Sequence, residues 1–168
     1  RPRHDDTPDE SRLAGIRVKR LFAPDHGPEM EVMKQMLKAR ERVDFAVFTF
    51  AQSSGIDDTM IALQRGGIRV RGLLDGTQGN QRWAATHGLV QAGAEIHLSR
   101  RSATLGHLHH KLMVVDRQVV IAGSFNYTEP ATRLNDENLV VLGDLHETRP
   151  GAIASQRRLA AYALAEID

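Results

Sequence analysis

The stretch LGHLHHKLMVVDRQVVIAGSFN, residues 105–126, carries the side chains of this chain that are best suited to chemistry. Three histidines lie within four positions, a lysine follows them directly, and an aspartate and a Gly-Ser-x-Asn segment come after. Histidines in this arrangement could bind a metal ion, fill part of a core, or offer a nitrogen nucleophile to a phosphorus atom. The residues around them help to choose among these roles.

A β-strand over this stretch would separate the histidines. Because alternate side chains of a strand share a face, His109 and Lys111 point one way, about 6–7 Å apart, and His110 points the other way. His107 shares the face of His109 and can border the same site. A structural zinc site needs several converging ligands, and the chain has no cysteine. We therefore expect no metal and no other cofactor here.

His109 beside Lys111 suits an anion bound between them. Lysine supplies a fixed positive charge for a phosphate oxygen, and a neutral imidazole supplies an uncharged nucleophile. Farther along, Ser124 and Asn126 present a hydroxyl and an amide, which are neutral donors for phosphate oxygens. Glu137, in the segment NDEN, could accept a hydrogen bond from His109 and fix the orientation of its ring.

The elements that must position these residues alternate between strands and helices. Apolar patterns predict strands over residues 16–24, 44–50, 68–75, 94–99 and 137–143, and a hairpin within 107–122. Helices are predicted from Pro28, over residues 56–65 and 80–93, and after Pro150. Crossover units of this kind imply an α/β fold with a mixed, largely parallel β-sheet flanked by helices on both faces.

Length and composition predict one domain. Residues 1–15 resemble a disordered arm because they lack apolar periodicity, and residues 16–168 form the single domain. The 168 residues, with 41% hydrophobic content, can build one core. The large aromatic side chains expected in that core are Phe45, Phe48, Phe50 and Trp83.

No apolar run approaches the roughly 18 residues that a membrane span needs, so we expect a soluble chain without a span. No targeting signal is visible, and the localisation stays unknown. The sequence begins at Arg1 rather than Met, which indicates a processed form or a piece of something longer.

Positive charge gathers in the middle of the chain. Residues 61–133 contain nine Lys and Arg against four Asp and Glu. Such a surface suits a phosphodiester, although a solvated face with scattered charges would have the same composition. Arg100 and Arg101 stand just before the histidines and could contact a nucleic-acid backbone.

The pattern HxKxxxxD followed by GSxN, from His109 to Asn126, resembles the signature motif of the phospholipase D superfamily. Six specified positions at about one in twenty each make a chance match on the order of 10⁻⁶ over this chain. The order of strands and helices from about residue 16 to 143 is also similar to the α/β sandwich of that family. Asp116 and Gly123 complete the motif.

The resemblance implies a role for each matching residue. His109 would attack phosphorus and form a phosphohistidine intermediate. Lys111 and Asn126 would hold the non-bridging oxygens, and Ser124 would assist them. Glu137 would orient a histidine. This chemistry uses no metal.

Asp116 belongs to the motif but is expected to serve the fold. It lies five positions after Lys111, and an odd offset in a strand reverses the face. We therefore predict a structural role for Asp116, in a turn or an ion pair. Gly123 is expected to let the backbone turn tightly.

The family's active site uses two copies of the motif, one histidine as nucleophile and the other as acid for the leaving oxygen. This chain holds one copy. The resemblance therefore implies a partner, either a second copy of the chain or another motif-bearing half. Since general acid catalysis contributes roughly 10² to 10⁴-fold, an isolated half should be nearly inert.

Three functions remain open. The first is a metal-independent nuclease that cleaves DNA or RNA phosphodiesters. The second is a phospholipase D or phosphatidyltransferase, which an exposed amphipathic segment would favour, and none is evident in the sequence. The third is a catalytically silent module that binds nucleic acid.

Overall fold

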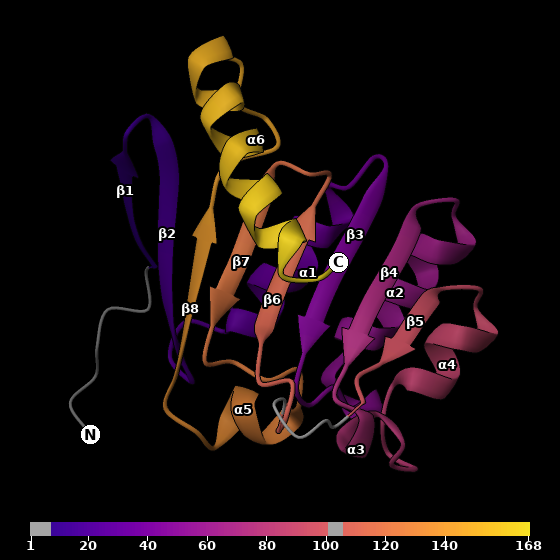
Figure 1. Ribbon diagram of the computed structural model, residues 1–168. Helices are drawn as coiled ribbons and strands as arrows, with labels where there is room; N and C mark the ends of the chain where they lie inside the picture. The colour runs from indigo at the N-terminus through magenta and orange to yellow at the C-terminus, as the bar shows by residue number, and fades with distance from the viewer. Residues whose placement is uncertain (1–7, 101–105) are drawn as a thin grey trace.

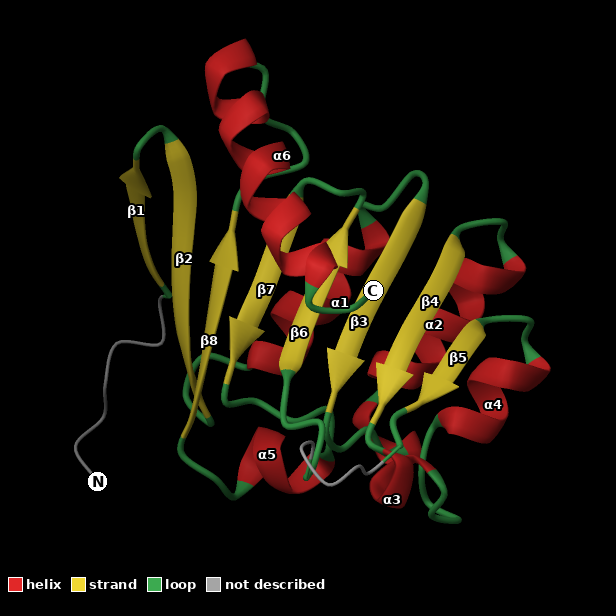
Figure 2. Ribbon diagram, viewed as in Figure 1, coloured by secondary structure: helices red, strands yellow, loops and turns green. Residues whose placement is uncertain are grey.

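The computed structural model describes residues 8–100 and 106–168 and is built around one β-sheet (Figures 1 and 2). The strands are β1 (Asp9–Leu13), β2 (Ile16–Ala23), β3 (Arg42–Val47), β4 (Arg69–Leu74), β5 (Glu95–Leu98), β6 (Lys111–Val115), β7 (Val119–Gly123) and β8 (Glu137–Leu142). The helices are α1 (Pro28–Leu37), the 3-10 helix η1 (Gln52–Ser54), α2 (Ile56–Arg65), α3 (Gly76–Gly79), α4 (Thr86–Gln91), α5 (Glu129–Arg133) and α6 (Pro150–Ala165).

Helices cover both faces of the sheet, as predicted. In Figure 1, α6 crosses the front face, and α1, α2 and α4 lie behind. Both α1 and α6 begin at a proline, Pro28 and Pro150, which occupies the first helical turn without losing a hydrogen bond. Among the described helices, none combines the length and the apolar character that crossing a bilayer requires.

The core has two parts, one on each face of the sheet. The larger part lies between the sheet and α1, α2 and α4, and it includes Phe45 and Phe50 as predicted. The smaller part lies under α6 and includes Ala46 and Ala160. Alternate residues of β3 therefore enter different parts of the core, and residues 43–47 are all buried. Because β3 is buried on both faces, it is held firmly in the sheet and positions the strands that pair with it.

The sheet is mixed, but it is not largely parallel as we predicted. Its order is β1-β2-β8-β7-β6-β3-β4-β5. Only the pairs β3–β4 and β4–β5 are parallel among the described strands, and the other five pairs are antiparallel. The crossovers through α2 and α4 build the parallel pairs, whereas the tight turn between β6 and β7 can join only antiparallel neighbours.

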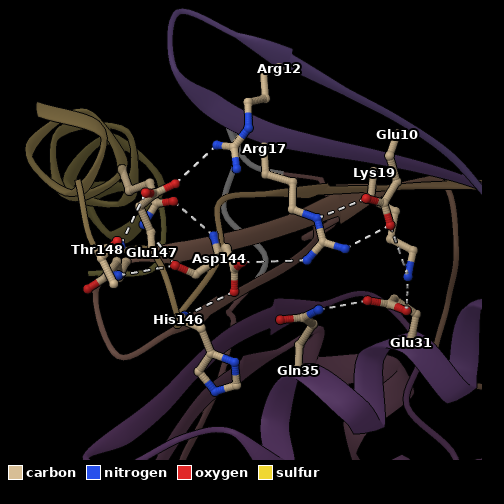
Figure 3. Close-up of polar contacts among 12 residues, drawn as sticks. Glu10, Arg12, Arg17, Lys19, Glu31, Gln35, Asp144, His146, Glu147 and Thr148 are labelled. Carbon is tan, nitrogen blue, oxygen red and sulfur yellow. Dashed lines mark hydrogen bonds and ion pairs between the residues drawn. The ribbon is translucent and has the colours of Figure 1, made fainter.

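The predicted disordered arm is wrong for residues 9–13, which form strand β1 and pair with β2. Every residue of β1 is exposed, so its sequence has no apolar periodicity. Ion pairs hold it instead, and Figure 3 shows this network. Arg17 of β2 lies 2.7 Å from Glu10, and Arg12 lies 3.1 Å from Glu147. Residues 1–7 lie outside the described part of the chain.

Two predicted elements are shorter than expected. The helix predicted over residues 80–93 is helical only over Thr86–Gln91, and a turn carrying Trp83 precedes it. Trp83 is 43% exposed, so its assignment to the core is corrected. The predicted hairpin is present, but β6 begins at Lys111, and residues 106–110 are irregular.

Candidate active site

His109, Lys111, Ser124, Asn126 and Glu137 lie at or near one edge of the sheet, where β3 and β7 end and β6 and β8 begin. Figure 1 shows these strand ends side by side. Lys111 pairs with Val47, the last residue of β3. Gly123 at the end of β7 pairs with Leu139, near the start of β8. Antiparallel pairing thus brings segments that are far apart in the sequence to the same edge.

His109 and Lys111 are in direct contact. Nζ of Lys111 lies 3.1 Å from Nδ1 and 3.3 Å from Nε2 of His109, and it donates to the carbonyl oxygen of His109 at 2.9 Å. The side chains approach more closely than a regular strand would bring them, because His109 precedes β6. His109 is exposed and Lys111 is half-buried, so solvent reaches the imidazole. A cation and a nitrogen nucleophile therefore share one small region.

Phe48 lies behind this pair rather than in the core, which corrects our prediction for it. Its ring centroid is 4.8 Å from that of His109, and Nζ of Lys111 lies 5.4 Å from the ring centroid. The Phe48 N–H also donates to the carbonyl of His110 at 2.8 Å. Phe48 thus supports the imidazole and makes a cation–π contact with the ammonium group.

His107 also borders the site through contact with Phe48. Their ring centroids are 5.9 Å apart, and Nδ1 of His107 lies 3.2 Å from Oδ2 of Asp75. Burial acts to raise the pKa of Asp75, but hydrogen bonds from the backbone of Gln78 and Thr77 and from His107 outweigh it and lower that pKa. The buried carboxylate at the start of α3 therefore anchors one edge of the site.

Ser124 and Glu137 form a hydrogen-bonded pair between β7 and β8. The hydroxyl of Ser124 donates to Oε2 of Glu137 and accepts from the backbone N–H of Asn138 at 3.0 Å. Oε1 of Glu137 accepts from Asn135 at 3.2 Å. These are the hydrogen bonds of the Glu137 carboxylate among the described residues, and the bond to His109 that we predicted is not one of them. Strand β7 lies between β8 and β6, so Ser124, which follows β7, pairs with Glu137 in place of His109.

The charge of Glu137 nevertheless acts on Lys111. Burial lowers the pKa of Lys111 below its ordinary value, and the negative charge of Glu137 partly opposes that shift. Among the described residues, the hydrogen-bond partners of the ammonium group all belong to His109 and none is a carboxylate, which leaves the group available to a bound anion.

Asn126 is held with its amide group fixed. Its Oδ1 accepts from the backbone N–H of Thr49 at 3.3 Å, so Nδ2 remains as a donor. The next residue, Tyr127, donates its N–H to the carbonyl of Thr49 at 3.1 Å. Gly123 approaches β8 so closely that a Cβ atom would lie 2.2 Å from the carbonyl oxygen of Asn138. Only glycine fits there without displacing the backbone.

Asp116 lies at the opposite edge of the sheet, in the turn between β6 and β7. Its carboxylate accepts from the backbone N–H groups of Arg40, Glu41 and Arg42 at 2.8, 3.0 and 2.9 Å. Its φ of 50° is in the left-handed region that aspartate tolerates better than most residues. Asp116 therefore joins the turn to the start of β3.

The remaining predicted residues are the two arginines before the motif. Arg100 is exposed after β5, and Arg101 lies outside the described residues. Within residues 8–100 and 106–168, no three His, Asp or Glu side chains gather in a way that could hold a metal ion.

Comparisons with known proteins identify relatives of this chain. Residues 32–150 match the family described as "Cardiolipin synthase, PLD-like domain". A phospholipase D from Rickettsia conorii is 30% identical over 139 residues, which are 80% of this chain and 65% of that protein. A mitochondrial cardiolipin hydrolase from Chlamydomonas reinhardtii is 34% identical over 106 residues, 63% of this chain and 46% of that protein. The chain thus spans about half to two thirds of the length of these relatives.

Solved structures share the fold. Nuc from Salmonella typhimurium, a phospholipase D family member, has a TM-score of 0.70 at 20% identity and covers 91% of this chain and 97% of its own. NucT from Helicobacter pylori has a TM-score of 0.72 at 18% identity, with 90% and 98% covered. With the match over residues 32–150, these similarities show that the chain belongs to the phospholipase D superfamily.

Proposed function

We propose that the chain is a phosphodiesterase that cleaves nucleic-acid phosphodiesters through a phosphohistidine intermediate. The observation that carries the proposal is the contact of Lys111 Nζ with the His109 ring at 3.1 Å, in solvent reach. Nδ2 of Asn126 offers a neutral donor at the same edge. A cation and an oriented amide are what two non-bridging phosphate oxygens need.

In the proposed reaction a ring nitrogen of His109 attacks phosphorus, and the bond from phosphorus to the leaving oxygen breaks. The histidine of the partner half gives its proton to that oxygen. Water then attacks the phosphohistidine, the partner histidine takes the water proton, and His109 leaves with its electron pair. Lys111 and Asn126 hold the phosphoryl oxygens throughout. Because Lys111 supplies the positive charge, the cycle has no step that requires a metal ion.

The partner half is either a second copy of this chain or another part of a longer protein. Two-fold symmetry would bring His109 of each copy to one phosphate with a single self-complementary surface. His109 is exposed at an edge of the sheet, which is compatible with such a meeting. The assembly should be permanent, because two clusters of like charge need surrounding apolar contact to stay together.

Nucleic acid is preferred as the substrate because of charge. Residues 61–133 carry nine basic against four acidic residues, and Arg100 is exposed just after β5. Phosphate contacts of this kind bind a polyanion independently of its sequence. Phospholipid is the second candidate, and it is favoured by the relatives named phospholipase D and mitochondrial cardiolipin hydrolase.

A single assay can separate these substrates. The purified protein would be mixed with labelled DNA and RNA, single- and double-stranded, and with phosphatidylcholine vesicles containing cardiolipin, each with and without EDTA. We expect cleavage of nucleic acid that EDTA does not reduce. Cleavage restored only by Mg²⁺ or Zn²⁺ would contradict the mechanism, and turnover of the lipids alone would assign the second candidate.

Sedimentation at micromolar concentration tests the two-histidine arrangement. We expect the active species to contain two motif-bearing halves. A monomer of this chain that cleaves phosphodiesters would contradict the arrangement, whereas an inactive monomer would indicate that another half is required.

A further inference from the structure

An uncharged cavity opens beside the candidate active site. Its volume is about 560 Å³, which is within the range of about 300–1,000 Å³ that small-molecule sites occupy. The residues that line it are Thr49, Ala51, Gln52, Trp83, Thr128 and Pro130. We call it the Trp83 cavity. It combines an aromatic ring and aliphatic groups with two hydroxyls and an amide.

One wall of the Trp83 cavity is the segment that orients the phosphate-binding groups. Thr49 donates its N–H to Oδ1 of Asn126, and its carbonyl accepts from Tyr127. The preceding residue, Phe48, lies 4.8 Å from the ring of His109. A ligand whose phosphate lies at Lys111 therefore has the cavity within reach of its neighbouring groups.

The backbone holds Trp83 at the mouth of this cavity. The N–H of Gln52 donates to the carbonyl of Trp83 at 3.0 Å. The side-chain amide of Gln52 donates to the carbonyls of Arg82 and Ala84 at 3.3 and 3.1 Å. Ala84 also forms a β-bridge with Ala51. These bonds fix the turn, while Trp83 as a whole residue stays 43% exposed. A large aromatic ring is thus positioned but not covered.

We propose that the Trp83 cavity binds an unpaired nucleobase, stacked on the indole, of a single-stranded nucleic acid whose phosphodiester lies at Lys111. A nucleic acid joins each charged phosphate to a flat, uncharged base. The protein likewise has a charged group, Lys111, and an uncharged aromatic site, the Trp83 cavity. Stacking on aromatic side chains is how proteins bind single strands without reading their sequence. The assignment rests on the proposed nuclease function and adds the strand type to it.

The polar groups of the lining favour a base over an acyl chain. The hydroxyls of Thr49 and Thr128 and the Oε1 atom of Gln52 can pair with the nitrogen and oxygen atoms at a base edge. A hydrocarbon chain would cover these groups and offer them no hydrogen bond, which is unfavourable. A base inside a duplex is already paired and stacked, so it would have to be flipped out to enter. The cavity should therefore select single strands over duplexes.

Trp83 is the only tryptophan of the chain, so its fluorescence reports on this cavity alone. The protein would carry His109→Ala to prevent cleavage. It would be titrated with a single-stranded oligonucleotide, the corresponding duplex, an abasic strand of equal charge, and phosphatidylcholine vesicles containing cardiolipin. We expect strong quenching by the single strand and little by the abasic strand or the duplex.

Affinity measured by anisotropy gives a second readout. In the same background, Trp83→Ala should weaken single-strand binding about tenfold, since one stacked base contributes roughly 5- to 150-fold. Trp83→Phe keeps an aromatic face and should retain most of the affinity. Circular dichroism would confirm that both variants are folded, and the quenching experiment does not depend on either of them.

Equal quenching by the abasic strand, or unchanged affinity in Trp83→Ala, would overturn the inference. A blue shift with vesicles and no quenching by the oligonucleotide would assign the cavity to an acyl chain instead. Cleavage of nucleic acid by the native protein without quenching would reject the cavity assignment alone. Quenching without cleavage, in a protein that sedimentation shows to contain two motif-bearing halves, would reject the nuclease function and keep the base site.

Discussion

The two ends of the β6–β7 hairpin carry residues of one motif but use them in opposite ways. At the turn, the carboxylate of Asp116 accepts three backbone N–H groups. At the open end, His109 is exposed, and Lys111 touches it without an acidic hydrogen-bond partner among the described residues. Polar groups that are saturated by the protein build the fold, whereas groups directed to solvent with bonding capacity left are available for a ligand.

The two ends are connected through β3. Asp116 ties the turn to Arg42, the first residue of that strand. From Arg42, strand β3 continues to Val47, which pairs with Lys111 at the other edge of the sheet. Phe48 follows directly and supports His109. The turn at Asp116, the saturated end, thus helps to position His109 and Lys111, the chemical end.

The largest expected effect is on the chemical end. His109→Ala should lower turnover on the order of 10⁴-fold or more, because it removes the proposed nucleophile, while the melting temperature stays near that of the native protein. His110→Ala is the matched control and should keep most activity. Initial rates on the preferred phosphodiester would measure both. Equal damage from the two changes would show that the wrong histidine has been assigned as nucleophile.

The next effect is on the saturated end and concerns stability. Asp116→Ala should lower the free energy of unfolding by about 2–3 kcal/mol, because three backbone N–H groups lose their acceptor and alanine is strained at positive φ. Asp116→Asn keeps one oxygen acceptor and tolerates that φ, so it should lose less. Urea unfolding would measure both, and the folded fraction should keep most of its activity. A catalytic defect without destabilisation would contradict the division between the two ends.

Much of the fold was predictable from local patterns. Proline positions and apolar spacing correctly predicted the starts of α1 and α6, and the apolar run around Phe45 correctly predicted a strand. Strand β1 was not predictable in this way, because ion pairs such as Arg17 with Glu10 hold it rather than apolar contacts. The proportion of parallel pairs depends on the strand order, which hydrophobic periodicity does not encode.

The site was predictable as a set of residues but not as a set of contacts. Motif spacing identified His109, Lys111 and Asn126, which the structure brings to one edge of the sheet. The support from Phe48 could not be foreseen, because it requires β3 to lie beside β6. The partner of Glu137 could not be foreseen either, because it depends on β7 lying between β8 and β6.

A smaller change tests the charge of Glu137. Glu137→Gln can still accept from Ser124 but loses the negative charge that acts on Lys111. We expect kcat/KM to fall about tenfold, since charged hydrogen bonds are about twice as strong as neutral ones. Glu129→Gln removes an equal charge from the exposed ion pair with Arg133 and serves as the control. Similar losses in both variants would indicate a general effect of net charge.

The smallest effect concerns the alkaline side of the pH profile. Burial lowers the pKa of Lys111 below the ordinary 10.5, with the charge of Glu137 in opposition. In the proposed mechanism the ammonium form binds phosphate, so kcat/KM should decline as pH rises through this lowered pKa, earlier than for an ordinary lysine. In Glu137→Gln the decline should begin at still lower pH, because the opposing charge is gone. Stability should move the other way, rising with pH between the lowered pKa and 10.5, because the unfolded chain holds the proton more tightly there. Lys111→Arg keeps its charge throughout and should remove the decline in whatever activity remains, and a decline that persists in that variant would assign it to another group.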